Sequence, residues 1–168
     1  MWAVLAVLAT LVATPAGPVH ADATLTQAHY RWYANNTNPS PLTAPGSALA
    51  AQNTPYIGAN LGTIYRLRLS AQVSGAPMNA DSQQFRLQFA TSVSGPWTDV
   101  GSVGATTIWR GSDNAQTLDS VDIDDLLLTS SNVKQTYQEN QPSVANRHTV
   151  SGGQIAEWDW VGIGRAHD

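Results

Sequence analysis

Apolar and polar side chains alternate along four segments, and this period of two limits what the chain can fold into more than any other feature. The four segments span residues 24–33, 63–74, 84–90 and 154–162. Successive side chains of a β-strand point to opposite faces, so alternation predicts sheets with one buried face and one solvated face. No stretch after residue 21 sustains a helical period over three turns. We therefore expect an all-β protein.

Large apolar residues occupy one face of each alternating segment, and we expect them to form the core. They are Trp32, Tyr65, Leu67, Leu69, Phe85, Leu87, Phe89, Trp158 and Trp160. Truncating a core tryptophan to alanine costs roughly 3–5 kcal/mol, so burial of these residues dominates the expected stability.

The opposite faces of the same segments carry charged side chains. Glu157 and Asp159 lie on the polar face of the last segment. Arginines lie on the polar faces of two other segments, at Arg66, Arg68 and Arg86. Where these segments pair, we expect ion pairs on a surface open to water, each contributing only about 0–1 kcal/mol.

Turn residues separate further short segments with weaker strand character. We expect strands at residues 97–100, 106–110, 118–123 and 132–137, and one short strand near 54–57. Residues 129–139 have a second interpretation, a short helix that Thr129 or Ser130 caps. Residues 126–128 are compatible with either a strand or a loop. About seven to nine short strands with turns between them predict an antiparallel β-sandwich of immunoglobulin or fibronectin type III character.

The beginning of the chain has the composition of an export signal. Residues 3–13 form an apolar run that is shorter than the ~20 residues needed to span a membrane. Proline and glycine follow this run, and the small residues Val19 and Ala21 fit a cleavage site. We expect a secretory signal peptide at residues 1–21 and a single β-sandwich domain, without a transmembrane segment, at residues 22–168. A short buried helix is the alternative for the apolar run.

The chain contains no cysteine, which excludes disulfide scaffolds, thiolate zinc sites and thiol nucleophiles. An exported chain without cysteine is stabilised by packing alone, which is typical of a bacterial envelope or extracellular protein. Charged residues make up 12% of the chain, and its formal net charge is −4. This composition lacks the excess of Lys and Arg that nucleic-acid-binding proteins use to contact phosphates, so we expect no nucleic-acid partner.

Several motifs follow one another in a characteristic order. They are AHYRWYANN (28–36), YRLRLSAQVSG (65–75), QQFRLQFATSVSGPWTDV (83–100), TIWRG (107–111), TYQENQPS (136–143) and AEWDW (156–160). Together they resemble the recurrent immunoglobulin-like or fibronectin-like β-sandwich module of bacterial secreted multidomain surface proteins. The resemblance covers nearly all of the chain after residue 21. It implies a structural or adhesive element and supplies no catalytic residues.

Acidic residues crowd one short segment of the chain. They are Asp119, Asp122, Asp124 and Asp125. Because Ca²⁺ takes several oxygen ligands, this segment is the candidate metal site. The spacing lacks the D-x-D-x-D-G pattern of calcium loops, and Leu126 to Leu128 follow at once. We expect a solvated acidic turn and no cofactor, with a calcium site as the alternative.

Carboxylates can also support glycoside hydrolysis, and Asp99, Glu157 and Asp159 are the candidates. Glu157 and Asp159 are expected roughly 6.5–7 Å apart along one strand, within the range that this reaction uses. A flat solvated face does not raise the pKa of one carboxyl group, as a catalytic acid requires. We therefore expect no enzyme, and a hydrolase or an accessory subunit ranks third among the functions considered.

Aromatic side chains permit a carbohydrate-binding alternative, in which a sugar ring stacks on Tyr33, Trp97 or Trp109. The leading expectation is a non-catalytic exported β-sandwich that serves as a structural or adhesive subunit of an extracellular or envelope assembly, such as a filament, sheath or surface complex. Its partners are other protein subunits, including copies of itself, joined where residues 24–33 pair with an open strand edge. The alternative is that this strand completes its own sheet.

Overall fold

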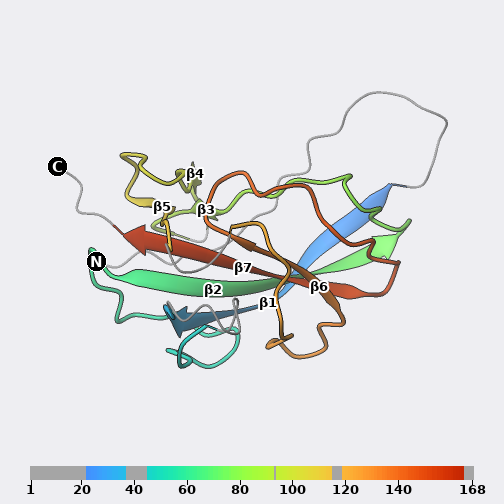
Figure 1. Ribbon diagram of the computed structural model, residues 1–168, viewed down its shortest axis with the longest axis horizontal. Helices are drawn as coiled ribbons and strands as arrows, with labels where there is room; N and C mark the ends of the chain where they lie inside the picture. The colour runs from blue at the N-terminus through green and yellow to red at the C-terminus, as the bar shows by residue number, and fades with distance from the viewer. Residues whose placement is uncertain (1–21, 37–44, 93, 115–118, 165–168) are drawn as a thin grey trace.

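The computed structural model describes residues 22–36, 45–92, 94–114 and 119–164, which form seven strands and no helix (Figure 1). The strands are β1 (Ala23–Ala34), β2 (Ile64–Gly75), β3 (Gln88–Phe89), β4 (Thr98–Asp99), β5 (Trp109–Gly111), β6 (Val133–Gln138) and β7 (Ile155–Gly164). The prediction of an all-β protein is therefore confirmed. In this part of the chain no helix is long and apolar enough to cross a membrane. The predicted signal peptide at residues 1–21 lies outside the described residues.

Five strands form one long sheet in which β2 lies between β1 and β7 (Figure 1). Both pairs, β1 with β2 and β2 with β7, are antiparallel. The other edge of β7 is shared, since β6 pairs with its first half in parallel and β5 pairs with its end in the antiparallel sense. β3 and β4 form a separate two-stranded sheet. Residues 133–138 are thus a strand, and the alternative of a helix at residues 129–139 is wrong.

One face of the long sheet carries the main core. All the residues that alternation assigns to the core are buried there, and none is more than 8% exposed. The ring centroid of Trp158 lies 4.7 Å from that of Phe85 and 6.2 Å from that of Trp160. Burying a large apolar side chain contributes roughly 1.5–3 kcal/mol, so these contacts hold the sheet against the layer above it.

The layer above this core contains little regular strand. Phe85 and Leu87 are buried in it, but their amides do not pair with a neighbouring strand. Phe85 N donates to Ser143 Oγ and Leu87 N donates to Gln141 Oε1, both at 3.0 Å. Because side chains replace a strand partner, the strand predicted at residues 84–90 is reduced to β3, although its alternating burial is retained.

The opposite face of the long sheet is also covered, so the expectation of a solvated face is wrong. Ile123 packs there with Tyr137 and Val161 in a second, smaller core. The amides of Leu127 and Leu128 reach the same face and donate to the carboxylate of Glu157. The covering segment has no alternating pattern, and for that reason the sequence does not reveal it.

The weaker strand predictions have mixed outcomes. The strand predicted at residues 97–100 is observed in shorter form as β4. The strand predicted at residues 106–110 is shifted toward the C-terminus and is observed as β5. Residues 54–57 contain no strand. Residues 119–123 contribute only a single bridge to β6, and position 118 lies outside the described residues.

Candidate functional site

Four charged side chains meet on the second face of the long sheet. Arg66 and Arg68 extend from β2, and Glu157 and Asp159 extend from β7 beside it. Arg66 donates twice to Asp159, from Nε to Oδ1 at 3.1 Å and from Nη2 to Oδ2 at 2.5 Å. Arg68 lies against both carboxylates, with Nε 2.8 Å from Asp159 and Nη1 3.1 Å from Glu157. Two positive and two negative charges thus form one continuous layer, which we call the ionic layer.

Each of the four side chains is 0% exposed, which contradicts the expected surface ion pairs. Charges removed from water are costly unless they are paired and hydrogen-bonded, and the ionic layer meets both conditions. Backbone amides donate hydrogen bonds to the carboxylate of Glu157. The backbone carbonyl of Asp125 accepts a hydrogen bond from Arg68 Nη1 at 2.8 Å. Burial disfavours the charged form of Arg66, but the carboxylate of Asp159 outweighs this effect, so the pKa of Arg66 is raised.

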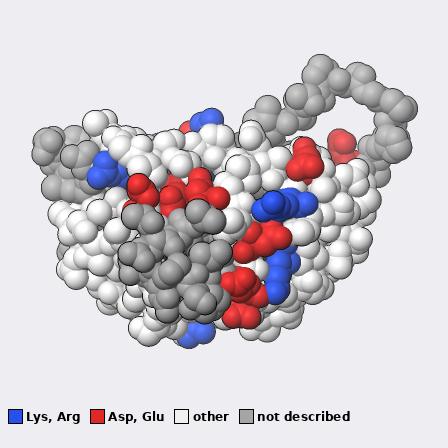
Figure 2. Space-filling model, in the orientation of Figure 1, with Lys and Arg blue, Asp and Glu red and all other residues white. Residues whose placement is uncertain are grey.

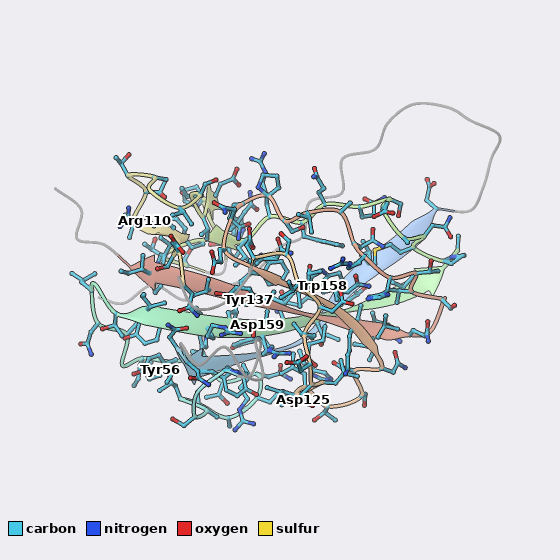
Figure 3. The ribbon with its side chains drawn as sticks, viewed as in Figure 1. Tyr56, Arg110, Asp125, Tyr137, Trp158 and Asp159 are labelled. Carbon is cyan, nitrogen blue, oxygen red and sulfur yellow. The ribbon has the colours of Figure 1, made fainter. Side chains whose placement is uncertain are left out.

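Tyr137 extends the ionic layer toward β6, and Figure 3 shows it beside Asp159. The guanidinium carbon of Arg66 lies 4.5 Å from the ring centre of Tyr137, a cation–π distance. The hydroxyl of Tyr137 donates to Glu139 Oε1 at 3.0 Å, and Asn114 N donates to the same oxygen at 3.0 Å. Burial raises the pKa of both Tyr137 and Glu139. Glu139 therefore holds its proton more tightly than an exposed carboxyl group does.

The carboxylates considered as a hydrolytic pair are engaged in this layer. Glu157 and Asp159 both pair with arginines on a face closed to solvent, and Glu157 also accepts from backbone amides. Such an arrangement fixes the register of β2 against β7 and leaves no open carboxylate pair at this position. Asp99, the third candidate, lies apart on β4 in an exposed pair with Arg86 at 2.7 Å. Hydrogen bonds from Gln88 and Arg86 lower the pKa of Asp99, which keeps it ionised.

The acidic residues between positions 119 and 125 bond to different partners. Asp119 accepts from Glu139 N at 2.8 Å, whereas Asp122 lies 3.0 Å from His148 Nε2. The backbone carbonyls of the other two aspartates accept hydrogen bonds from basic side chains. Within the described part of the chain, no three His, Asp or Glu side chains gather in a way that could hold a metal ion. The described residues therefore provide no set of side-chain ligands for the calcium site that the sequence offered as an alternative.

The aromatic candidates for sugar stacking lie on three different segments, Tyr33 on β1, Trp97 just before β4 and Trp109 on β5. Tyr33, one of the candidates for sugar stacking, is only 6% exposed, so its ring is not open to a ligand. Trp109 is half-buried, and its ring centroid lies 6.2 Å from that of Trp32. Trp97 is half-buried just before β4. The three rings therefore do not build one stacking platform.

The edges of the long sheet differ in how they are covered. β6 is bonded along its outer side by residues 120–123, and β5 by Gly101. The second half of β1 is covered by residues 46–53, in which Leu49 N donates to Trp32 O at 2.9 Å. No described segment hydrogen-bonds the outer side of residues 23–27, which we call the open edge.

Most of the surface seen in Figure 2 is neither acidic nor basic. Its acidic side chains gather in bands with a few basic ones among them. Exposed ion pairs of the described residues join Arg86 to Asp99 and Arg147 to Asp122. Family models, curated proteins and solved structures offer no match to this chain. The candidate functional site must therefore be argued from its geometry, and the open edge is the strongest candidate.

Sequence reasoning anticipated the open edge only in part. It placed residues 24–33 in a strand and considered an intermolecular pairing, and the structure pairs the strand with β2 of the same chain. It missed the cover over the second half of β1, because residues 46–53 lack a strand pattern. It predicted that Glu157 and Asp159 pair with arginines of a neighbouring strand, which the structure confirms, but it missed the burial of this layer.

Proposed function

We propose that the chain is a non-catalytic structural or adhesive subunit of an extracellular or envelope assembly, and that it associates through the open edge. The observation that carries this proposal is the unequal cover of the sheet. The outer sides of β5, of β6 and of the second half of β1 carry hydrogen-bonded segments. The outer side of residues 23–27 has no described partner. An unpaired strand edge is a ready template for another strand.

The composition of the open edge supports association. Residues 23–27 are Ala-Thr-Leu-Thr-Gln, with neither a charged residue nor a proline. Natural sheets protect their edges with lysine, proline or bulges, and here only a bulge between Gln27 and His29 is present, at the far end of the segment. Ala23 and Leu25 pack against the core, while Thr24 and Thr26 face solvent. The edge is thus held in strand form by its own core before any partner arrives.

A second copy of the chain is the partner that this edge fits. Two identical edges can pair antiparallel about a two-fold axis, so that each uncharged threonine meets an uncharged neighbour. The product is one sheet that runs through both copies. Pairing of this kind closes on itself, and a longer assembly needs a second contact elsewhere on the molecule.

The finer description of the fold belongs to the same proposal. The main core between the long sheet and the layer that contains β3 and β4 fits a β-sandwich of immunoglobulin or fibronectin type III character. Engagement of Glu157 and Asp159 in the ionic layer supports a non-catalytic role. The pattern of residues 1–21 supports export to the cell envelope or beyond.

Sedimentation of the purified protein over a range of concentrations tests the proposal. We expect a monomer–dimer equilibrium, with slower amide hydrogen exchange at residues 23–27 as the concentration rises. In the double variant Thr24→Lys/Thr26→Lys, four positive charges meet across the pair, and the dissociation constant should rise by about tenfold or more, which is 1.4 kcal/mol.

The variant Thr63→Lys/Thr129→Lys is the matched control, since both threonines are exposed and lie away from the open edge. It should dimerise like the unchanged protein. A protein that stays monomeric with rapidly exchanging amides at residues 23–27 would overturn the proposal. So would a dimer that both double variants form equally well.

A further inference from the structure

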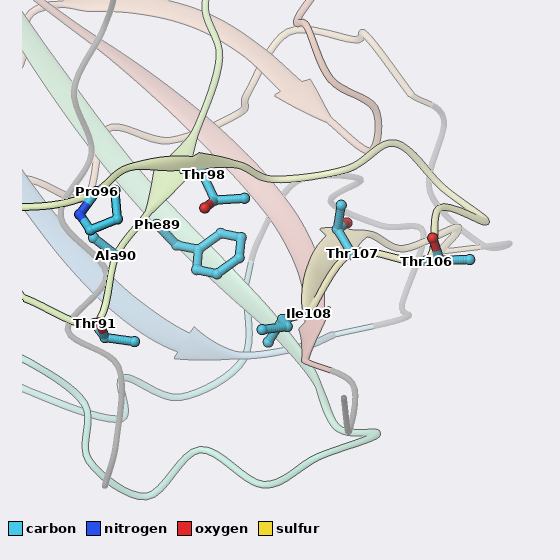
Figure 4. A pocket seen from close by; sticks show the side chains of 8 residues that line it. All are labelled: Phe89, Ala90, Thr91, Pro96, Thr98, Thr106, Thr107 and Ile108. Carbon is cyan, nitrogen blue, oxygen red and sulfur yellow. The ribbon is translucent and has the colours of Figure 1, made fainter. Parts of the chain in front are cut away.

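A groove lies beside the two-stranded sheet, about 370 Å³ in volume. Figure 4 shows Phe89 and Ile108 between Thr91 and Pro96 on one side and Thr107 on the other. Its volume lies at the lower end of the range that small-molecule sites occupy. The groove is formed where β3, β4 and the chain before β5 meet.

The floor of the groove is apolar and its rim carries hydroxyl groups. Pro96 and Ile108 supply the exposed apolar surface, with Ile108 38% exposed, and the ring of Phe89 closes the bottom of the groove although it is only 6% exposed. Thr91, Thr98 and Thr106 line the rim and are exposed. Unlike Thr107, whose hydroxyl donates to Trp109 O at 2.7 Å, their hydroxyls make no hydrogen bond to another described residue. Three hydroxyls around one floor are thus open to a ligand.

Among the residues that the structure describes, no charged side chain lines the groove. Of the charged residues close to this lining in sequence, Arg86 and Asp99 pair with each other at 2.7 Å, and Arg110 is turned to the carbonyl of Ala105, to which its Nη1 donates at 3.3 Å. A charged ligand would lose water in the groove without gaining a counter-charge, which is unfavourable.

We propose that this groove binds a neutral saccharide. A pyranose ring presents an apolar face of C–H groups and a polar edge of hydroxyls, which matches an apolar floor with a hydroxyl rim. A purely apolar ligand would strip water from Thr91, Thr98 and Thr106 and return no hydrogen bond, at a cost of about 1–3 kcal/mol for each hydroxyl. The same chemistry therefore disfavours both charged and purely apolar ligands. This site is distinct from the open edge and does not depend on association there.

Titration of the full-length protein with neutral oligosaccharides tests the inference, with methyl signals of threonine and isoleucine followed by NMR. Tetrasaccharides of glucose, galactose and mannose are the probes. We expect at least one of them to shift the methyl signals of Ile108, Thr98 and Thr106 with a dissociation constant of about 0.1–5 mM. The variant Thr98→Val/Thr106→Val keeps the shape of the rim without its hydroxyls, and it should bind about tenfold more weakly.

The variant Thr63→Val/Thr129→Val is the control, because both threonines lie outside the groove. It should bind as the unchanged protein does, and circular dichroism should show the same fold for both double variants. Absence of methyl shifts with every saccharide would overturn the inference. Equal binding by Thr98→Val/Thr106→Val, or shifts caused by a neutral Gly-Ser peptide and by no saccharide, would overturn it as well.

Discussion

Arg66, Arg68, Glu157 and Asp159 are the residues whose environment most decides the behaviour of this protein. A buried ion pair is a poor source of net stability, since the cost of desolvation offsets its attraction. Removing one partner is different, because the remaining charge is left buried without compensation. The ionic layer therefore acts as a set of constraints, in which each charge is tolerated only while the others are present.

The variant Asp159→Asn should be strongly destabilised. It leaves the two arginines with a single carboxylate in a layer that is 0% exposed. We expect the free energy of unfolding to fall by about 3–5 kcal/mol, measured by chemical denaturation. Asp99→Asn is the matched control, since Asp99 pairs with Arg86 on the surface, and it should cost only about 0–1 kcal/mol. Equal costs for the two variants would show that the ionic layer is open to water.

Glu139 gives the fold a dependence on pH. Because burial raises its pKa, the folded state binds this proton more tightly than the unfolded state does. Its contribution to stability is therefore present at low pH and is lost as the pH rises through the pKa of the folded state.

The variant Glu139→Gln removes this titration and keeps an oxygen that can accept from Asn114 and Tyr137. Its melting temperature relative to the unchanged protein should rise between about pH 4 and about pH 8. Thermal unfolding at several pH values measures the difference. A difference that is constant or falls with pH would contradict the role assigned to Glu139.

At the scale of elements, alternation located the long strands but not their cover. β1, β2 and β7 lie within one or two residues of the positions predicted from the sequence. A period of two reports that side chains point to two faces, and it does not report whether a second segment lies over the polar face. Residues 119–128 provide that cover without any periodicity, so the burial of Glu157 could not be predicted. The groove was missed for a similar reason, since threonines are common in strands and carry no pattern of their own.

Gly111 tests how β5 is held against its neighbours. A Cβ at this position would lie 1.8 Å from the carbonyl oxygen of Glu139, so the backbone must shift to admit it. We expect Gly111→Ala to reduce the free energy of unfolding by about 1–3 kcal/mol. Gly164→Ala, in the strand that pairs with β5, is the control, because its Cβ would meet Trp109 only at 3.5 Å, an ordinary contact. Thermal unfolding of both variants measures the contrast, and similar losses would contradict it.

At the scale of the whole molecule, the two proposed contact sites lie at opposite ends of the long sheet. The open edge pairs with the end of β2 near Gly75, whereas β5, beside the groove, pairs with the end of β7 near Gly164 (Figure 1). Gly164 lies beside the beginning of β2, next to Ile64. One copy can therefore join another at one end and present its groove at the other.

Calcium should have no effect on the stability of the molecule. Asp119 and Asp122 already bond to Glu139 and His148 on different segments, so they cannot converge on one ion without breaking these contacts. We expect equal melting temperatures in millimolar Ca²⁺ and in excess chelator. A bound ion at 100 times its dissociation constant would add about 2.7 kcal/mol, so a rise in melting temperature with Ca²⁺ would restore the calcium alternative.

The position of β7 has a consequence for the order in which the chain can acquire its structure. β7 is the last strand among the described residues, and it bonds to β2, β5 and β6. Until the ribosome has added residues 155–164, these three strands lack their common partner, and the arginines of β2 lack their carboxylates. The unfinished polypeptide is thus kept from premature collapse into its final form.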